Sequence, residues 1–236
     1  MKPLLYIFCL LASAVQAQDL GANSLNSQTE TRRSEAKPIV KAYLPLFQDG
    51  TTADGLAVLG EEYFKISKPI QAVEIFIRAL ALQADHAGAM NGKAKATKNL
   101  ESKNARIAKL QVMEEKAGNA QHACSRAAIL FHLGYMGDAL DVLKDANNRY
   151  RNNGEILALE HTLKGGIAIE TMVVRAVLKD FRQNLTEKKL TAALNNLAEY
   201  HVFSLGTGNT RKLLKELTDT FPTELDSAKV KAALGV

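Results

Sequence analysis

Tryptophan is absent from the 236 residues, and the chain has only two cysteines, Cys9 and Cys124. Cys9 lies in an apolar segment at the amino end, and removal of that segment would leave Cys124 alone and exclude an intramolecular disulfide. A single cysteine in an alanine-rich stretch is typical of a small buried hydrophobe. No second apolar run of comparable length follows, so the sequence predicts no membrane span.

A strong excess of one charge is also missing. The chain has 30 Lys and Arg residues against 25 Asp and Glu residues, which gives a formal net charge of +5. The basic residues are mixed with acidic ones along most of the chain. Because nucleic-acid binders concentrate basic charge on one face, we expect no nucleic-acid partner.

Patterns that carry catalysis or bind metals are scarce as well. No two histidines show the four-residue helical spacing with acidic support that a zinc site needs. Ser125 and Ser204 lack the glycine-framed elbow of a nucleophile. Glu160 and Glu199 are the only carboxylates on apolar helical segments that suit a catalytic acid. The sequence therefore predicts no catalytic residue, no metal site, no cofactor and no enzymatic activity.

The amino end has the pattern of an export signal. Lys2 precedes the apolar stretch 4–15, and small residues including Ala17 come before a polar segment. We predict a signal peptide over residues 1–17 and export across the cytoplasmic membrane, to the periplasm if the source is bacterial. Residues 18–38 are rich in Asn, Ser and Thr, so we predict a flexible polar tether there.

Residues 53–84 contain the clearest pattern in the chain, two short amphipathic helices in succession. Leu56, Leu59 and Tyr63 are three and four residues apart, which places them on one face of the first helix. Gly60 lies beside them and permits close approach of the second helix. The predicted inner face of that second helix carries Ala72, Phe76 and Ala79.

The second helix of this pair recurs later in the chain. Ala139 corresponds to Ala72, Leu143 to Phe76, and Ala146 to Ala79. The separation of Ala72 and Ala139, 139 minus 72, is 67 residues. A separation close to two periods predicts a degenerate unit between them, over residues 87–116. Its expected inner residues are Met90, Ala94, Ile107 and Leu110.

These positions and their spacing resemble the signature of the tetratricopeptide repeat (TPR) family, with Leu56 in place of the usual tryptophan. The resemblance implies an all-α fold, an α-solenoid of antiparallel helix pairs wound as a right-handed superhelix. It places TPR-like hairpins over residues 39–166, with the best repeat at 53–84. A helix break at Gly165-Gly166 and a C-terminal helical extension and cap over 167–236 complete the predicted organisation.

The degenerate unit carries an unusual number of basic residues. On one uninterrupted helix Lys95, Lys98, Arg106 and Lys109 would fall within about 80° of each other, whereas a break near Ser102 would divide them between two helices. The TPR resemblance places polar groove residues close to these positions. The candidate partner-binding residues are Asn91, Lys95, Lys98, Asn99, Arg106 and Lys109.

An acidic peptide or a chain-terminal carboxylate would suit this basic group, and an ordinary solvated face is the alternative. The two-carboxylate clamp of chaperone-binding TPR domains is not supported, since the matching positions hold Ala57, Glu61, Cys124 and Ala128.

The sequence thus favours an exported, non-catalytic TPR scaffold or adaptor that binds a protein or peptide partner in cell-envelope assembly or secretion. Two other functions stay open at this point. One is a structural protein that self-associates through an uncapped end of the helical stack. The other is a helical enzyme that cleaves cell-wall glycan.

Overall fold

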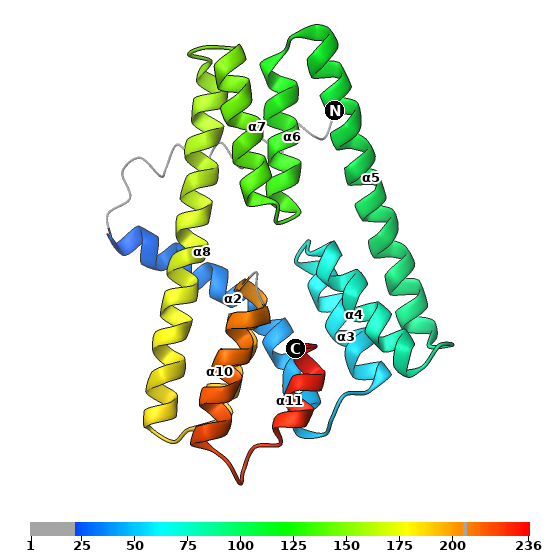
Figure 1. The fold of residues 1–236 in the computed structure, drawn as a ribbon, viewed down its shortest axis with the longest axis vertical. Coiled ribbons are helices and arrows are strands. Elements are labelled where there is room, and N and C mark those ends of the chain that lie inside the picture. The colour runs from blue at the N-terminus through cyan, green and yellow to red at the C-terminus, as the bar shows by residue number, and fades with distance from the viewer. Residues whose placement is uncertain (1–21, 205–206) are drawn as a thin grey trace. The chain divides into compact units, whose positions relative to one another are not determined.

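A computed structural model describes residues 22–204 and 207–236, and every regular element in this part of the chain is a helix (Figure 1). The predicted all-α class is therefore confirmed, while the predicted signal peptide lies outside the described residues. None of the described helices combines the length and apolar character needed to cross a bilayer. The ten helices are α2 (Ala22–Gln48), α3 (Ala53–Lys65), α4 (Pro69–Leu82), α5 (Ala87–Ala117), α6 (Ala120–His132), α7 (Met136–Arg149), α8 (Gly154–Thr186), α9 (Leu190–Phe203), α10 (Thr207–Thr220) and α11 (Ser227–Leu234).

The described residues form two compact units. Unit 1 contains residues 22–28 and 98–169, and unit 2 contains 29–97, 170–204 and 207–236. Helices α6 and α7 lie wholly in unit 1. Helices α3, α4, α9, α10 and α11 lie wholly in unit 2, and the chain of α2, of α5 and of α8 continues from one unit into the other.

Helices α3 and α4 pack together as the predicted hairpin of unit 2. Phe76 is fully buried, and a Cβ added at Gly60 of α3 would lie 2.7 Å from its ring. A Cβ at Gly92 of α5 would lie 2.3 Å from the same ring. Both glycines thus let a neighbouring helix close over the faces of Phe76. The other predicted inner residues are also buried: Leu56, Leu59, Tyr63, Ala72 and Ala79.

The turn of this hairpin has a specific geometry that recurs in unit 1. Ser67 adopts a left-handed conformation (φ 62°), and the amide of Lys68 donates to the carbonyl of Tyr63 at 3.0 Å. The turn between α6 and α7 repeats both features. Gly134 is left-handed (φ 90°), and the amide of Tyr135 donates to the carbonyl of Leu130 at 3.0 Å. The predicted counterparts Ala139, Leu143 and Ala146 are all fully buried.

The same turn occurs a third time, between α8 and α9 in unit 2. Lys188 is left-handed (φ 56°), and the Lys189 amide donates to the Asn184 carbonyl at 2.9 Å. Ala193 and Leu197 follow at the same offsets as Ala72 and Phe76, and both are fully buried. The turn geometry is therefore kept in the predicted C-terminal extension, where the side chains differ from those of the hairpin signature.

Residues 22–38 are helical, as part of α2, rather than a flexible tether. The helix continues through Pro38 and buries Ala36, Ile39 and Tyr43 on one side at three- and four-residue spacing. Arg32 and Arg33 on this segment pair with carboxylates of α8 and α9 in unit 2. These distant partners offset the entropy of ordering, which the polar local sequence alone does not.

Helix α5 is continuous over 31 residues, so the degenerate unit is not a helical hairpin with a break near Ser102. Of its expected inner residues, Met90 and Ala94 are exposed, and Ile107 and Leu110 are half-buried. The buried positions are small: Ala89 and Ala96 are fully buried on the face that carries Gly92. Small residues pack there because Phe76 already fills the space between the helices.

Helix α8 likewise passes through Gly165-Gly166 without a break. A Cβ at Gly166 would lie 2.9 Å from the ring of Phe131, whereas a Cβ at Gly165 would meet nothing within 4 Å. Gly166 thus serves the packing of α8 on α6 in unit 1, and the predicted helix terminus is wrong.

Two glycine substitutions in unit 1 test these assignments, and they should change the free energy of unfolding in opposite directions. Gly134→Ala should lower the free energy of unfolding by about 1 kcal/mol, because a left-handed residue that gains a Cβ is strained. Gly165→Ala should raise it by roughly 0.5–1 kcal/mol, because alanine is favoured over glycine inside a continuous helix. Urea unfolding followed by circular dichroism measures both. Destabilisation by Gly165→Ala would contradict the continuity of α8.

Candidate functional site

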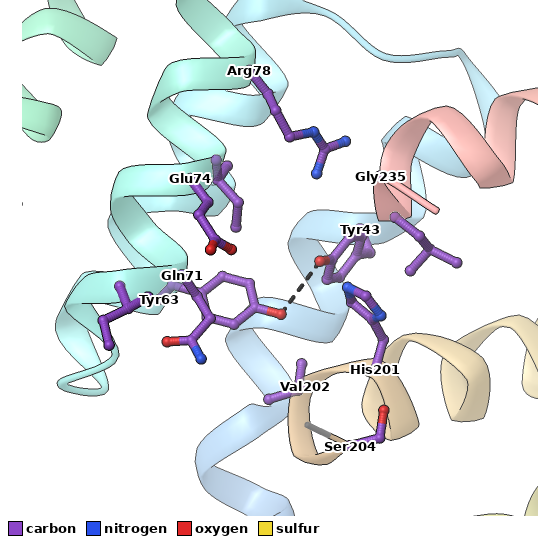
Figure 2. Close-up of a pocket in the computed structure, with 12 residues that line it drawn as sticks. Tyr43, Tyr63, Gln71, Glu74, Arg78, His201, Val202, Ser204 and Gly235 are labelled. Carbon is purple, nitrogen blue, oxygen red and sulfur yellow. Dashed lines mark hydrogen bonds between the residues drawn. The ribbon is translucent and has the colours of Figure 1, made fainter. Parts of the chain in front are cut away.

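A cavity of about 370 Å³ lies within unit 2 (Figure 2). Its polar lining comes from four separate helices and the segment after α9, and its apolar lining is largely aliphatic. The polar residues are Tyr43, Tyr63, Gln71, Glu74, Arg78, His201 and Ser204. The other lining residues are Ile70, Ile75, Val202, Leu234 and Gly235.

Helix α4 supplies the largest share of this lining because of its periodicity. Gln71, Glu74 and Arg78 are three and four residues apart, so they form a stripe beside the buried Ala72–Phe76–Ala79 face. Tyr43 comes from α2 and Tyr63 from α3, and Figure 2 shows the two phenol rings meeting at the cavity. Gly235 follows the last turn of α11 in a left-handed conformation (φ 72°).

The hydroxyls of Tyr43 and Tyr63 form a hydrogen bond of 3.3 Å, although both residues are almost completely buried (1% and 3% exposed). Burial raises the pKa of Tyr43 to about 12, and it raises the pKa of Tyr63 well above its usual value. Both phenols are therefore neutral at physiological pH. The pair has two O–H donors, and a single bond between them uses only one.

Arg78 reaches from α4 to the end of α11. Its Nη2 donates to the carbonyl of Ala233 at 2.7 Å and also to that of Ala232. The last carbonyls of a helix lack partners within the helix, so the guanidinium acts as a C-terminal cap for α11. Burial is the main influence on this group and lowers the pKa of Arg78.

Near the cavity, the side chains of His201 and Lys68 are both shielded from water. The imidazole Nδ1 of His201 lies 3.2 Å from the hydroxyl of Thr210, and its ring meets the Tyr43 ring edge-on at 6.0 Å. Burial, and then the positive charges of Arg78 and Lys68, lower the pKa of His201 to about 4. Burial lowers the pKa of Lys68 to about 8, and its Nζ donates to the carbonyl of Val202 at 2.7 Å.

The neutral His201 predicts a loss of stability in mild acid. An unfolded histidine takes up its proton near pH 6.5, whereas His201 in the fold does so near pH 4, so the unfolded state binds more protons between these values. The free energy of unfolding should fall by up to about 3 kcal/mol as the pH drops through this window. His201→Gln should remove most of that pH dependence in denaturant titrations, whereas the exposed His161→Gln should leave it. An unchanged slope in His201→Gln would contradict this assignment.

The six sequence-predicted residues lie elsewhere, on α5, and all six are exposed. At 100° per residue they fall within about 100° of one another, and the buried Ala89 and Ala96 lie on another side of the helix, more than about 100° from the centre of this group. We call this surface the α5 basic face; it comprises Asn91, Lys95, Lys98, Asn99, Arg106 and Lys109. Within the described residues none of these four basic side chains forms an ion pair. The exposed Met113 lies on this face, and the exposed Val112 lies beside it.

The carboxylates named as possible catalytic groups are held in ion pairs. Glu199 accepts two hydrogen bonds from Arg33, at 2.8 and 3.0 Å, and Glu160 pairs with Lys164 at 2.6 Å. Among the described residues, no three His, Cys, Asp or Glu side chains are grouped in a way that suits a metal ion.

Unit 1 contains a buried charge cluster that the sequence does not reveal. The Glu114 side chain is 1% exposed, and its oxygens lie 3.0 Å from Arg126 and 3.2 Å from Arg149. Neither contact has hydrogen-bond geometry, so Coulombic attraction is the main compensation for burying this carboxylate. The cluster ties α5 to α6 and α7 inside unit 1.

Sequence reasoning also missed the cavity. Its residues come from helices up to 190 positions apart along the chain, so no local spacing brings Tyr43, Arg78 and His201 together. Comparison with known protein families, with curated proteins and with solved structures finds no match to this chain.

Proposed function

We propose that the chain is an exported, non-catalytic helical scaffold of TPR type, and that its α5 basic face binds an acidic segment of a protein partner. The observation that carries the proposal is the arrangement of α5 itself. One continuous helix buries small residues on one side and presents six polar or basic residues together on the other.

The chemistry of this face favours an acidic partner. Lys95, Lys98, Arg106 and Lys109 contribute four positive charges, whereas Glu101 is the only carboxylate between Lys93 and Lys109. Exposed like charges along a helix repel one another, and a bound acidic segment would relieve that repulsion. The exposed Val112 and Met113 would add apolar contact to such an interface.

Three hairpin turns of equal geometry support the scaffold part of the proposal. Each turn contains one residue in the left-handed conformation: Ser67, Gly134 or Lys188. A fully buried alanine follows that residue five positions later in each case. Recurrence of one supersecondary unit is characteristic of repeat proteins, whose usual role is to bind partners over an extended surface. Within this proposal the α-solenoid stacking follows from the TPR resemblance, and the export follows from the signal-peptide pattern of residues 1–17.

Charge reversal tests the proposal directly. Lys95→Glu with Lys98→Glu should abolish capture of the partner from an extract of the source cells, because four units of charge change on the binding face. Capture by the unchanged protein should also weaken as salt rises.

The matched control reverses two exposed lysines on other helices, Lys144→Glu on α7 and Lys179→Glu on α8. This variant has the same net charge as the first and should capture the partner normally. Equal loss of capture in both variants would indicate non-specific electrostatics, and undiminished capture by the α5 variant would refute the role of the α5 basic face.

A further inference from the structure

The cavity of unit 2 has the properties of a binding site, and it is separate from the α5 basic face. We infer that it binds a small amino-acid-like zwitterion, with the ligand carboxylate at Arg78 and the tyrosine pair and the ligand ammonium at Glu74 (Figure 2).

Arg78 is the first reason. Four arginines are buried or half-buried in the described chain, and three of them, Arg32, Arg33 and Arg126, pair with carboxylates. Arg78 instead donates through Nη2 to two helix-end carbonyls, and within the described residues it has no carboxylate partner. Its Nε and Nη1 protons are left for another acceptor.

The position of Gly235 keeps those protons accessible. A Cβ at Gly235 would lie 3.0 Å from Nη1 of Arg78, so any larger residue would crowd the guanidinium. Gly235 also adopts a left-handed conformation that suits glycine. The backbone therefore passes close to Arg78 without covering it with a side chain.

The tyrosine pair is the second and independent reason. Tyr43 and Tyr63 share one hydrogen bond, so one of their two O–H groups has no acceptor among the described residues. Both side chains are more than nine-tenths buried and line the cavity. A buried donor without an acceptor destabilises the fold, and a bound carboxylate oxygen would remove that cost by accepting its hydrogen bond.

Glu74 determines the second charge of the ligand. It lies one helical turn before Arg78 and lines the same cavity, yet the two form no ion pair in the described structure. One unpaired cation and one unpaired carboxylate on the same wall match a ligand that carries both opposite charges. Ile70, Ile75 and Leu234 leave the rest of the wall aliphatic, and a volume of about 370 Å³ lies at the lower end of the range for small-molecule sites.

The experiment is a titration of the full protein with L-leucine, followed in ¹H–¹⁵N spectra. Saturable shifts are expected for amides around the cavity, such as Gln71, His201 and Gly235. Isopentylamine, which lacks the carboxylate, should bind at least about tenfold more weakly, because it makes no charge-assisted contact with Arg78. 4-Methylpentanoate, which lacks the ammonium, should lose affinity by a smaller factor.

Variants separate the contributions of the cavity residues. Tyr43→Phe with Tyr63→Phe removes both hydroxyls but keeps both rings, and should weaken L-leucine binding about tenfold. Glu74→Gln should bring L-leucine and 4-methylpentanoate to equal affinity, whereas Glu61→Gln, outside the cavity, should change nothing. Absence of saturable shifts with L-leucine would overturn the inference, because water alone would then fill the cavity. Equal binding of L-leucine and isopentylamine would also overturn it, because the carboxylate would then make no contact with Arg78 or the tyrosine pair.

Discussion

Replacing Phe76 with alanine should lower the free energy of unfolding by about 3–5 kcal/mol, the range found for fully buried aromatic residues. Phe76 is 0% exposed, and its ring fills the space beside two glycines, Gly60 of α3 and Gly92 of α5. A truncated side chain would leave a void between three helices. Neither glycine can fill it, since neither has a side chain.

Denaturant unfolding followed by circular dichroism measures this effect, and the adjacent Ile77→Ala is its control. Ile77 is 48% exposed on the same helix, so its truncation should cost only about 0.5 kcal/mol. A loss below about 1 kcal/mol in Phe76→Ala would show that the ring is not the packing centre of unit 2.

Arg33→Met should destabilise unit 2 by about 3 kcal/mol, because it leaves a buried carboxylate without its cation. Arg33 donates to both oxygens of Glu199, and these two side chains are 18% and 11% exposed. Its third contact, to Asp180 at 2.9 Å, involves a carboxylate that is 39% exposed and contributes little after solvent screening.

A double-mutant cycle with Glu199→Met isolates this ion pair. The double variant should be markedly more stable than the sum of the two single losses predicts, because no unpaired charge is left in the protein interior. Unfolding midpoints of the four proteins give the coupling energy. Additive losses would mean that Arg33 and Glu199 contribute to stability independently and not as an ion pair.

The hairpins could be predicted from the sequence because their packing is local. Leu56, Tyr63 and Phe76 lie within 21 residues of one another, and helical spacing alone brings them to one interface. The burial of Ala139 and Leu143 followed from the same pattern two periods later. The third turn, at Lys188, could not be predicted from the sequence, because the helix that follows it carries different side chains at the inner positions. Only the backbone geometry of the turn is kept.

The remaining features depend on contacts that are distant in sequence. Arg32 and Arg33 find their partners 138 and 166 residues away, so α2 appears in the local sequence as a polar tether. The local sequence predicts a helix terminus at Gly166, because the contact of this residue with Phe131 is visible only in three dimensions. The cavity depends on the same kind of distant contact, between α2, α3, α4, α9 and the end of α11.

A photo-crosslinker at position 102 tests the proposed role of the α5 basic face most directly. Ser102 is exposed and lies near the middle of that face by helical periodicity. With Ser102→p-benzoylphenylalanine in the source cells, we predict one discrete protein adduct that disappears when Lys95→Glu and Lys98→Glu are added. The same crosslinker at the exposed Lys144 of α7 should give no such adduct. An adduct that survives the charge reversal, or one that forms equally from position 144, would contradict partner binding by the α5 basic face.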